Sequence, residues 1–188
     1  TVRYYRRLGA WVNRIGLRNP GIDWLVDRVR AGRIEPADKL ISIHGFDEAQ
    51  WRTLLDKAAG MQPMGIELNM SCPNVGEIDW PADLFERAAG CGSPIVVKLP
   101  PINYDLIVER ALQEGLGAFH CCNTLPVPGG GLSGTPLQPL SLQCIRRLRS
   151  ALAGEIGEAL TIIGGGGIRE PADIDAYAAA GARHFAIG

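Results

Sequence analysis

The sequence predicts an α/β fold built from parallel βαβ units, and three observations support this prediction. Six short apolar runs, several of them β-branched, alternate with longer amphipathic stretches. Gly, Asn or Pro marks the passage from most runs to the stretch that follows. The chain also starts with Thr1 rather than Met and stops at Gly188 directly after the sixth run. We therefore expect one domain over residues 1–188, an incomplete eight-stranded (β/α)8 barrel that lacks the first two strands and the last helix, rather than an open doubly wound sheet.

The expected strands are short and mostly apolar, as strands buried on both faces are. They lie near residues 39–44, 65–69, 94–99, 117–122, 160–164 and 183–187. The expected helices lie near residues 22–31, 47–59, 81–89, 103–114, 137–152 and 171–180. Residues typical of helix starts stand near the beginning of several of these stretches: Asp47, Asp173, Pro81, Pro136 and Pro171.

Composition narrows the class of protein. Hydrophobic residues make up 46% of the chain and the formal net charge is −1, which is typical of a globular domain and gives no basic surface for nucleic acid. No apolar run approaches the roughly 20 residues of a membrane span. The five cysteines contain no C-x-x-C pair, which argues against a zinc clip, an iron–sulfur cluster and a disulfide framework. We expect a cytosolic protein that binds no metal, membrane or nucleic acid.

Polar side chains gather where neighbouring expected strands end. Asn69, Cys72 and Asn74 follow the strand near 65–69, Lys98 closes the next strand, and Asn123 follows the strand near 117–122. The carboxyl ends of parallel strands meet at one rim of a barrel, where active sites are built. The sequence therefore predicts a catalytic site at this rim.

The strand near 117–122 allows a prediction of side-chain direction, because residues two apart on a strand share a face. Counting back from Asn123 places Cys121 and Phe119 on the Asn123 face. The same count turns His120 and Cys122 away from the site.

Two glycine-rich runs, residues 129–134 and 164–167, each precede an expected helix. Glycine backbone can approach an anion closely, and a helix N-terminus favours negative charge. Each run could instead form only a tight turn. The position of the second run, after the penultimate strand, favours a phosphate site.

The chain resembles the dihydroorotate dehydrogenase family in six motifs that occur in the family's order and span nearly the whole sequence. Asn69-Met70-Ser71-Cys72-Pro73-Asn74 is the most specific of them. The motifs lie at residues 13–21, 67–74, 97–101, 123–124, 130–134 and 163–168. The resemblance implies a (β/α)8 TIM barrel that holds FMN at its C-terminal face.

The resemblance also implies roles for individual residues. Cys72 matches the base that takes a proton from the substrate, and Lys98 matches the lysine beside the flavin ring. Matches to the substrate-binding residues are Asn13, Asn69, Asn74, Asn123 and Thr124. Matches to the FMN phosphate cradle are Gly134, Gly166 and Gly167. The implied reaction is oxidation of dihydroorotate, a small dihydropyrimidine, to orotate in pyrimidine biosynthesis. An ion pair with Glu67 is the alternative role for Lys98.

Other functions stay open at this point. Only residues 125–129 separate Thr124 from Gly130, where the family usually has a longer segment, so the substrate could differ from dihydroorotate. A dihydropyrimidine dehydrogenase shares the motif through Cys72, a tRNA-dihydrouridine synthase has a related loop, and a non-catalytic flavin- or phosphate-binding remnant would keep the folding motifs. Cys in the base position resembles the soluble branch of the family. The electron acceptor and a homodimer are left open.

Overall fold

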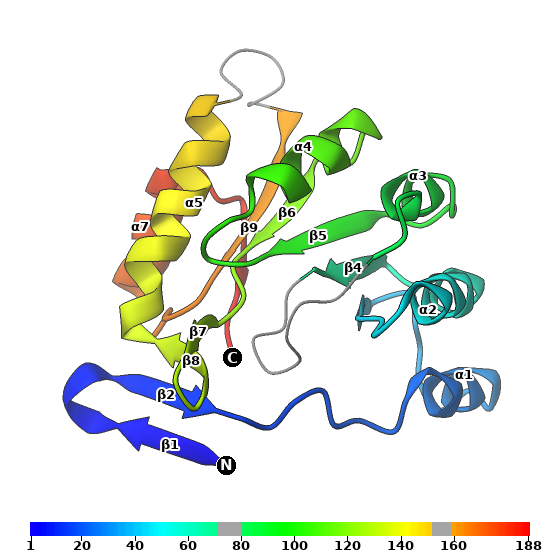
Figure 1. The fold of residues 1–188 in the computed structure, drawn as a ribbon, viewed down its shortest axis with the longest axis horizontal. Coiled ribbons are helices and arrows are strands. Elements are labelled where there is room, and N and C mark those ends of the chain that lie inside the picture. Colours follow the sequence, from blue (N-terminus) through cyan, green and yellow to red (C-terminus); the bar gives the residue numbers. More distant parts are fainter. Residues whose placement is uncertain (71–79, 152–158) are drawn as a thin grey trace.

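A computed structural model describes residues 1–70, 80–151 and 159–188, and its main element is a curled sheet of six parallel strands (Figure 1). The strands are β3 (Leu40–Ile43), β4 (Gly65–Asn69), β5 (Ile95–Leu99), β6 (Ala118–Cys121), β9 (Thr161–Gly165) and β10 (His184–Ala186). Their order in the sheet is β10-β9-β6-β5-β4-β3. All six expected strands are confirmed, and six of the eight strands of a (β/α)8 barrel are present in this chain.

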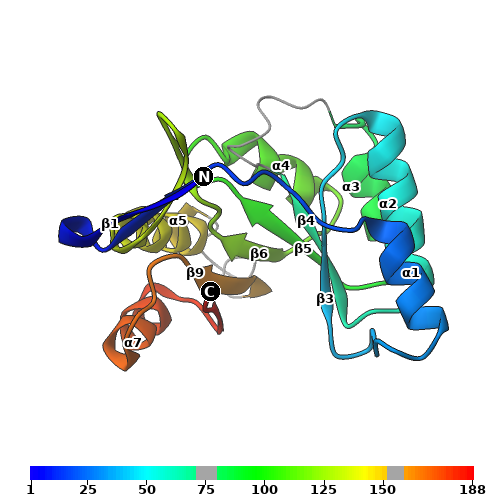
Figure 2. The same cartoon turned by 90° about the horizontal axis from the view of Figure 1, so that it is seen from below.

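Helices cover the outer face of this sheet, as Figures 1 and 2 show. They are α1 (Ile22–Arg30), α2 (Glu48–Gly60), α3 (Leu84–Ala89), α4 (Asp105–Gln113), α5 (Gln138–Ala151) and α7 (Pro171–Ala180). Asp47 caps α2 by accepting a 2.8 Å hydrogen bond from the backbone N–H of Gln50. At α7, Pro171 is the first helical residue, while Asp173 bonds back to the N-cap Glu170 in a capping box. The alternation of strand and helix therefore follows the predicted pattern.

The hydrophobic core lies between the sheet and the helices. Ile66 and Leu68 of β4 and Val97 and Leu99 of β5 are fully buried on the helix side of the sheet. The residues between them, including Glu67 and Lys98, face the inside of the curl, as the period of two requires. One face of each strand thus supports the fold, and the other is left to build a site.

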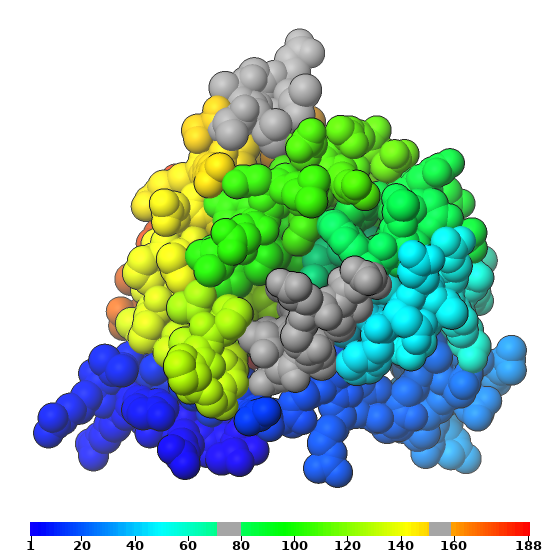
Figure 3. Space-filling view, in the orientation of Figure 1, coloured from blue at the N-terminus to red at the C-terminus, as the bar shows by residue number. Residues whose placement is uncertain are grey.

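A second, antiparallel sheet was not predicted. It contains β1 (Val2–Tyr5), β2 (Ala10–Asn13), β7 (Leu125–Val127) and β8 (Gly130–Gly134), in the order β1-β2-β8-β7. Figure 3 shows the first two strands, in dark blue, along one edge of the molecule next to the β7–β8 hairpin. Short 3₁₀ helices, η1 (Arg6–Leu8) and η2 (Thr135–Leu137), follow β1 and β8. This sheet packs the N-terminal segment against the glycine-rich segment at residues 130–134.

Among the described residues, no helix is long and apolar enough to cross a membrane.

Candidate active site

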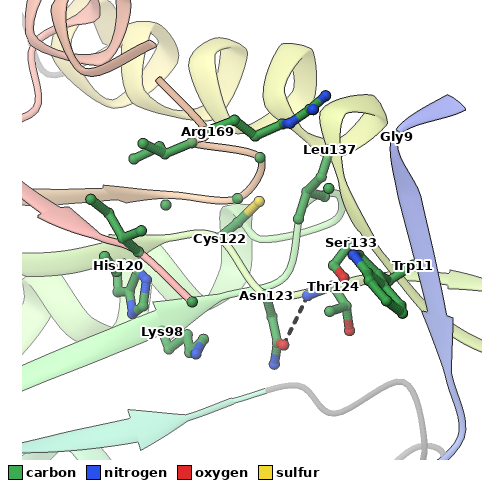
Figure 4. A pocket seen from close by; sticks show the side chains of 18 of the residues that line it. Gly9, Trp11, Lys98, His120, Cys122, Asn123, Thr124, Ser133, Leu137 and Arg169 are labelled. Carbon is green, nitrogen blue, oxygen red and sulfur yellow. Dashed lines mark hydrogen bonds between the residues drawn. The ribbon is translucent and has the colours of Figure 1, made fainter. Parts of the chain in front are cut away.

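A cavity of about 410 Å³ lies where the two sheets meet (Figure 4). Lys98 of β5 and His120 of β6 lie at its base, and Asn123 and Thr124 follow β6 at its side. The antiparallel sheet contributes Trp11 to another wall. The described residues that complete its lining are Tyr4, Gly9, Cys122, Ser133, Gly134, Leu137, Gly165, Gly166, Gly167, Ile168, Arg169, Ala186, Ile187 and Gly188. The volume falls within the range of 300–1,000 Å³ that is usual for small-ligand sites.

Three of the predicted substrate-binding residues form one chain of hydrogen bonds. The Asn123 side-chain amide donates to Asn69 Oδ1 at 2.9 Å, and Asn123 Oδ1 accepts from the Thr124 backbone N–H at 2.8 Å. His44 Nδ1 lies 2.6 Å from the Asn69 carbonyl oxygen, which fixes the end of β4. The bonds hold the amide groups at the rim, where they can offer both donors and acceptors to a ligand.

Glu67 is the centre of a polar network beneath the cavity. It is 4% exposed, and its carboxylate accepts a 2.7 Å hydrogen bond from Ser42 Oγ and lies 2.6 Å from His120 Nδ1. Lys98 Nζ stands 3.6 Å from Glu67 Oε1. Burial by itself would raise the pKa of the Glu67 carboxyl, but the His120 hydrogen bond, the Lys98 charge and the Ser42 hydrogen bond lower it to about 2. Glu67 is therefore an anion at neutral pH, and the alternative ion pair of Lys98 with Glu67 is present.

The predicted direction of the β6 side chains is wrong. His120 pairs with Lys98 in the β5–β6 register and lines the cavity beside it, whereas Cys121 and Phe119 are buried in the core. The count began at Asn123, but β6 ends at Cys121, so the strand alternation does not extend to the residue from which we counted. His120 is thus a site residue that the sequence did not identify.

The glycine-rich end of the cavity is closely packed backbone. Gly134 has φ +94°, and a Cβ there would lie 2.3 Å from the Gly9 carbonyl oxygen; Gly167 has φ +82°, and its Cβ would lie 2.6 Å from the Gly134 carbonyl oxygen. Only glycine satisfies both the positive φ and the close approach. Buried side chains from the helices fix the loop after β9: Ser141 donates to the Gly165 carbonyl at 2.6 Å and Tyr177 to the Gly166 carbonyl at 2.5 Å. The predicted cradle residues Gly134, Gly166 and Gly167 therefore lie together.

Arg169 adds a positive charge to this end of the cavity. Its Nη1 donates a 3.2 Å hydrogen bond to Thr135 Oγ1, which holds the guanidinium beside Gly9. Figure 4 shows the side chain along the wall between the glycine loop and Leu137. Arg169 was not predicted, although its place two residues after the glycine run was a signal that could have identified it.

The described thiols near the cavity are protonated at neutral pH. Burial raises the pKa of Cys122 to about 12, although its contact with Ser141 opposes the shift. The interaction with Cys144 and burial together raise the pKa of Cys121. Neither thiol has the properties of a base or a nucleophile.

Two predicted site residues within the described ranges, Asn13 and Asn69, are not among the residues that line this cavity, although Asn69 is hydrogen-bonded to Asn123, which does line it. Asn13 ends β2 opposite Gly131. Cys72 and Asn74 lie outside the described residues. Within the described ranges, no group of three or more His, Cys, Asp or Glu side chains is arranged to hold a metal ion.

The residues present fit FMN. The Gly134 and Gly166–Gly167 backbone together with Arg169 suits a phosphate, which needs close N–H groups and positive charge. Lys98 and the Asn123 amide, toward the other side of the cavity, suit the polar edge of a ring. The donor set therefore has the two parts that a flavin mononucleotide requires.

Comparisons with known proteins agree with this arrangement. The family description "Dihydroorotate dehydrogenase" matches residues 1–188. The catalytic subunit of dihydroorotate dehydrogenase B (NAD(+)) from Alkaliphilus oremlandii is 29% identical, over all of this chain and 69% of that protein. The corresponding subunit from Methanopyrus kandleri is 31% identical, over 93% of this chain and 63% of that protein. The solved dihydroorotate dehydrogenase of Eimeria tenella in complex with ferulenol superposes with a TM-score of 0.77 at 19% identity, over all of this chain and 64% of that one.

The chain spans about two thirds of the length of the relatives it matches. The family match nevertheless covers every residue, and the fold agrees with that of a solved family member. The rim amides, the Lys98–Glu67 ion pair and the glycine cradle lie on strands and loops that carry the sequence motifs. Sequence, fold and site together place this chain in the dihydroorotate dehydrogenase family of FMN-dependent oxidoreductases.

Proposed function

We propose that the protein oxidises dihydroorotate to orotate, with FMN in the cavity between the two sheets. The observation that carries the proposal is that one cavity has glycines and Arg169 at one end and Lys98 with the Asn123 amide at the other. The dihydroorotate dehydrogenase family match, which covers residues 1–188, supports it. Forming the ring double bond removes a proton from one carbon and a hydride from its neighbour. FMN, when bound, supplies the hydride acceptor.

The chain's own residues divide the remaining work. Lys98 places a positive charge at the cavity base, which favours negative charge on a ring edge. Asn69, Asn123 and Thr124 hold the substrate through a preformed hydrogen-bond chain, so that little ordering is left for the moment of reaction. Cys72 is proposed as the proton acceptor and Asn74 and Asn13 as further substrate contacts, on the strength of the sequence motifs.

A substrate comparison tests this proposal. The purified protein should carry bound flavin and oxidise dihydroorotate faster than 5,6-dihydrouracil when an artificial electron acceptor is supplied. The two substrates are compared because the β7–β8 hairpin is short. Residues 125–134 form a tight antiparallel hairpin where the family usually has a longer segment, and this difference could change the substrate. Preference for dihydrouracil would replace the proposal by a dihydropyrimidine dehydrogenase-like activity, and absence of flavin would refute both.

The proposed substrate is a small molecule, a dihydropyrimidine, as the family match implies. The relatives from Alkaliphilus oremlandii and Methanopyrus kandleri are catalytic subunits of an NAD(+)-type enzyme, so we propose an electron-accepting partner subunit for this chain as well. A homodimer and a cytoplasmic location stay predictions.

A further inference from the structure

We propose that His120, assisted by Ser42, is a positioning residue that keeps the Lys98 ammonium available to the ligand of the cavity by occupying the carboxylate of Glu67. Where this inference names FMN as the ligand, it rests on the proposed function. Three side chains, Ser42, Lys98 and His120, compete for the one carboxylate of Glu67.

Both oxygens of the Glu67 carboxylate already accept hydrogen bonds. Ser42 Oγ donates to Oε1 at 2.7 Å, and His120 Nδ1 lies 2.6 Å from Oε2. Because Glu67 is ionised and can only accept, Nδ1 must carry the proton that is shared with it. Each carboxylate oxygen therefore has a hydrogen-bond donor other than Lys98, which contributes only its charge.

Lys98 is close to Glu67 without being hydrogen-bonded to it. The 3.6 Å between Nζ and Oε1 exceeds the 2.7–3.2 Å usual for an N–H···O bond. The hydrogen bonds found among the described residues include none from Nζ, and the ammonium lines the cavity. Charge thus holds Lys98 near Glu67 while its N–H donors stay directed to the cavity.

Removing the imidazole would change this balance. Without His120, Oε2 loses its donor, and the buried carboxylate keeps only the Ser42 hydrogen bond and the charge of Lys98. A charge-assisted bond is about twice as strong as a neutral one, and Nζ, which lies 3.6 Å from Oε1, needs to move by less than about 1 Å to form one with that oxygen. We therefore expect Lys98 to turn from the cavity to Glu67 when His120 cannot donate.

The four side chains come from four adjacent strands, which makes the arrangement part of the sheet. Ser42 of β3 is in register with Glu67 of β4, and Lys98 of β5 is in register with His120 of β6. All of them lie on the inner face, since the alternate positions of β4 and β5 are buried against the helices. Backbone pairing therefore fixes the competition, and it does not depend on a loop.

Two substitutions at residue 120 test the inference. His120→Phe keeps a ring and removes the donor, whereas His120→Gln keeps an N–H that can reach Glu67. In the FMN-free protein, labelling of Lys98 by an amine-acylating reagent, read by mass spectrometry, should fall about 10-fold in His120→Phe and recover in His120→Gln. The dissociation constant of FMN should rise by a similar factor in His120→Phe only.

The control is His120→Phe in a protein that lacks the Glu67 carboxylate. In a Glu67→Gln background no anion competes for Lys98, so His120→Phe should change labelling and FMN affinity less than about 2-fold. Equal losses in both backgrounds, or no rescue by His120→Gln, would show that His120 acts by packing and would overturn the inference. If His120→Phe fails to fold, Ser42→Ala on the edge strand β3 removes the other donor and should lower Lys98 labelling in the same direction.

The two proposals fail separately. A wild-type protein that binds no FMN would refute the proposed function, while the labelling of Lys98 would still decide whether His120 protects it from Glu67. A protein that binds FMN but shows no coupling between residues 67 and 120 would leave the proposed function standing and refute the positioning role.

Discussion

At the scale of single residues, the site depends on a buried anion whose charge is balanced by its neighbours. Glu67 is almost fully buried, and a lone carboxylate there would be neutralised by protonation. The donors from Ser42 and His120 and the charge of Lys98 keep it ionised. Such a group is a stabilising element only as long as its partners are present.

This balance predicts an acid-dependent loss of stability. The folded-state pKa of Glu67, about 2, lies below its ordinary value of 4.5, so ionised Glu67 stabilises the fold above about pH 4.5, and the contribution disappears as pH falls toward 2. The difference in free energy of unfolding between the wild type and Glu67→Gln should shrink by about 3 kcal/mol across that window. Chemical denaturation at several pH values measures it, and a difference that stays constant with pH would contradict the prediction.

The proposed base gives a second prediction at this scale. Positioned bases contribute about 10²- to 10⁴-fold to a rate, so Cys72→Ala should slow reduction of the bound flavin by dihydroorotate by that factor without loss of FMN. Stopped-flow absorbance measures the step. Cys91→Ala, a half-buried thiol after α3 and away from the cavity, is the control and should react at the wild-type rate. An unchanged rate in Cys72→Ala would exclude this thiol as the base.

At the scale of elements, the loop after β9 and the segment from β8 into η2 form the anion end of the cavity. Their glycines pack backbone to backbone, and Arg169 lies across them through its bond to Thr135. We expect the guanidinium to contact the phosphate of the bound nucleotide, because it is the positive group at that end among the described lining residues.

The loop therefore predicts a ligand-specific effect of one substitution. Arg169→Gln should raise the dissociation constant of FMN about 10-fold or more, since a hydrogen bond to a charged group contributes about 1.5–3 kcal/mol. Riboflavin lacks the phosphate, so its affinity should not change. Arg110→Gln on the exposed face of α4 is the matched control. Equal weakening of FMN and riboflavin would mean that Arg169 supports the loop and does not contact phosphate.

Elements also show how far the sequence could predict this fold. The β3, β4, β5, β6 and β9 strands are mostly buried apolar runs, β10 is a short and partly exposed one, and local patterning identified all of them. The β1–β2 hairpin has exposed Tyr4 and Trp11 among arginines, and β8 is largely glycine, so neither has a strand-like pattern. The β1–β2 and β7–β8 pairs are local hairpins, but they form one sheet because β2 pairs with β8 across more than a hundred residues, which no local signal records.

The site was predictable to a similar degree. The motifs identified Lys98, Asn69, Asn123, Thr124 and the glycines that the structure brings together. The contact between Glu67 and His120 joins residues 53 positions apart and depends on the sheet register, which the sequence does not state. His120 was assigned to the wrong face because the count began at Asn123, which lies beyond the end of β6 at Cys121, where the alternation of side chains along the strand no longer holds.

At the scale of the whole molecule, the two sheets form opposite sides of the cavity. The curled parallel sheet brings the polar ends of β4, β5 and β6 together, and the antiparallel sheet closes the other side of the cavity with Gly134 and Trp11. Figure 2 shows both sheets meeting near the carboxyl ends of the parallel strands. The cavity therefore requires contacts between the first 13 residues of the chain and its last third.

The central claim is that this cavity holds FMN and transfers reducing equivalents from dihydroorotate to it. Anaerobic titration of the purified, flavin-loaded protein with dihydroorotate tests the claim most directly, with flavin absorbance and orotate followed together. We predict one FMN per chain, complete bleaching of the flavin, and one orotate formed for each flavin reduced. Flavin that stays oxidised in the presence of excess dihydroorotate, or a protein that binds no flavin, would contradict the account.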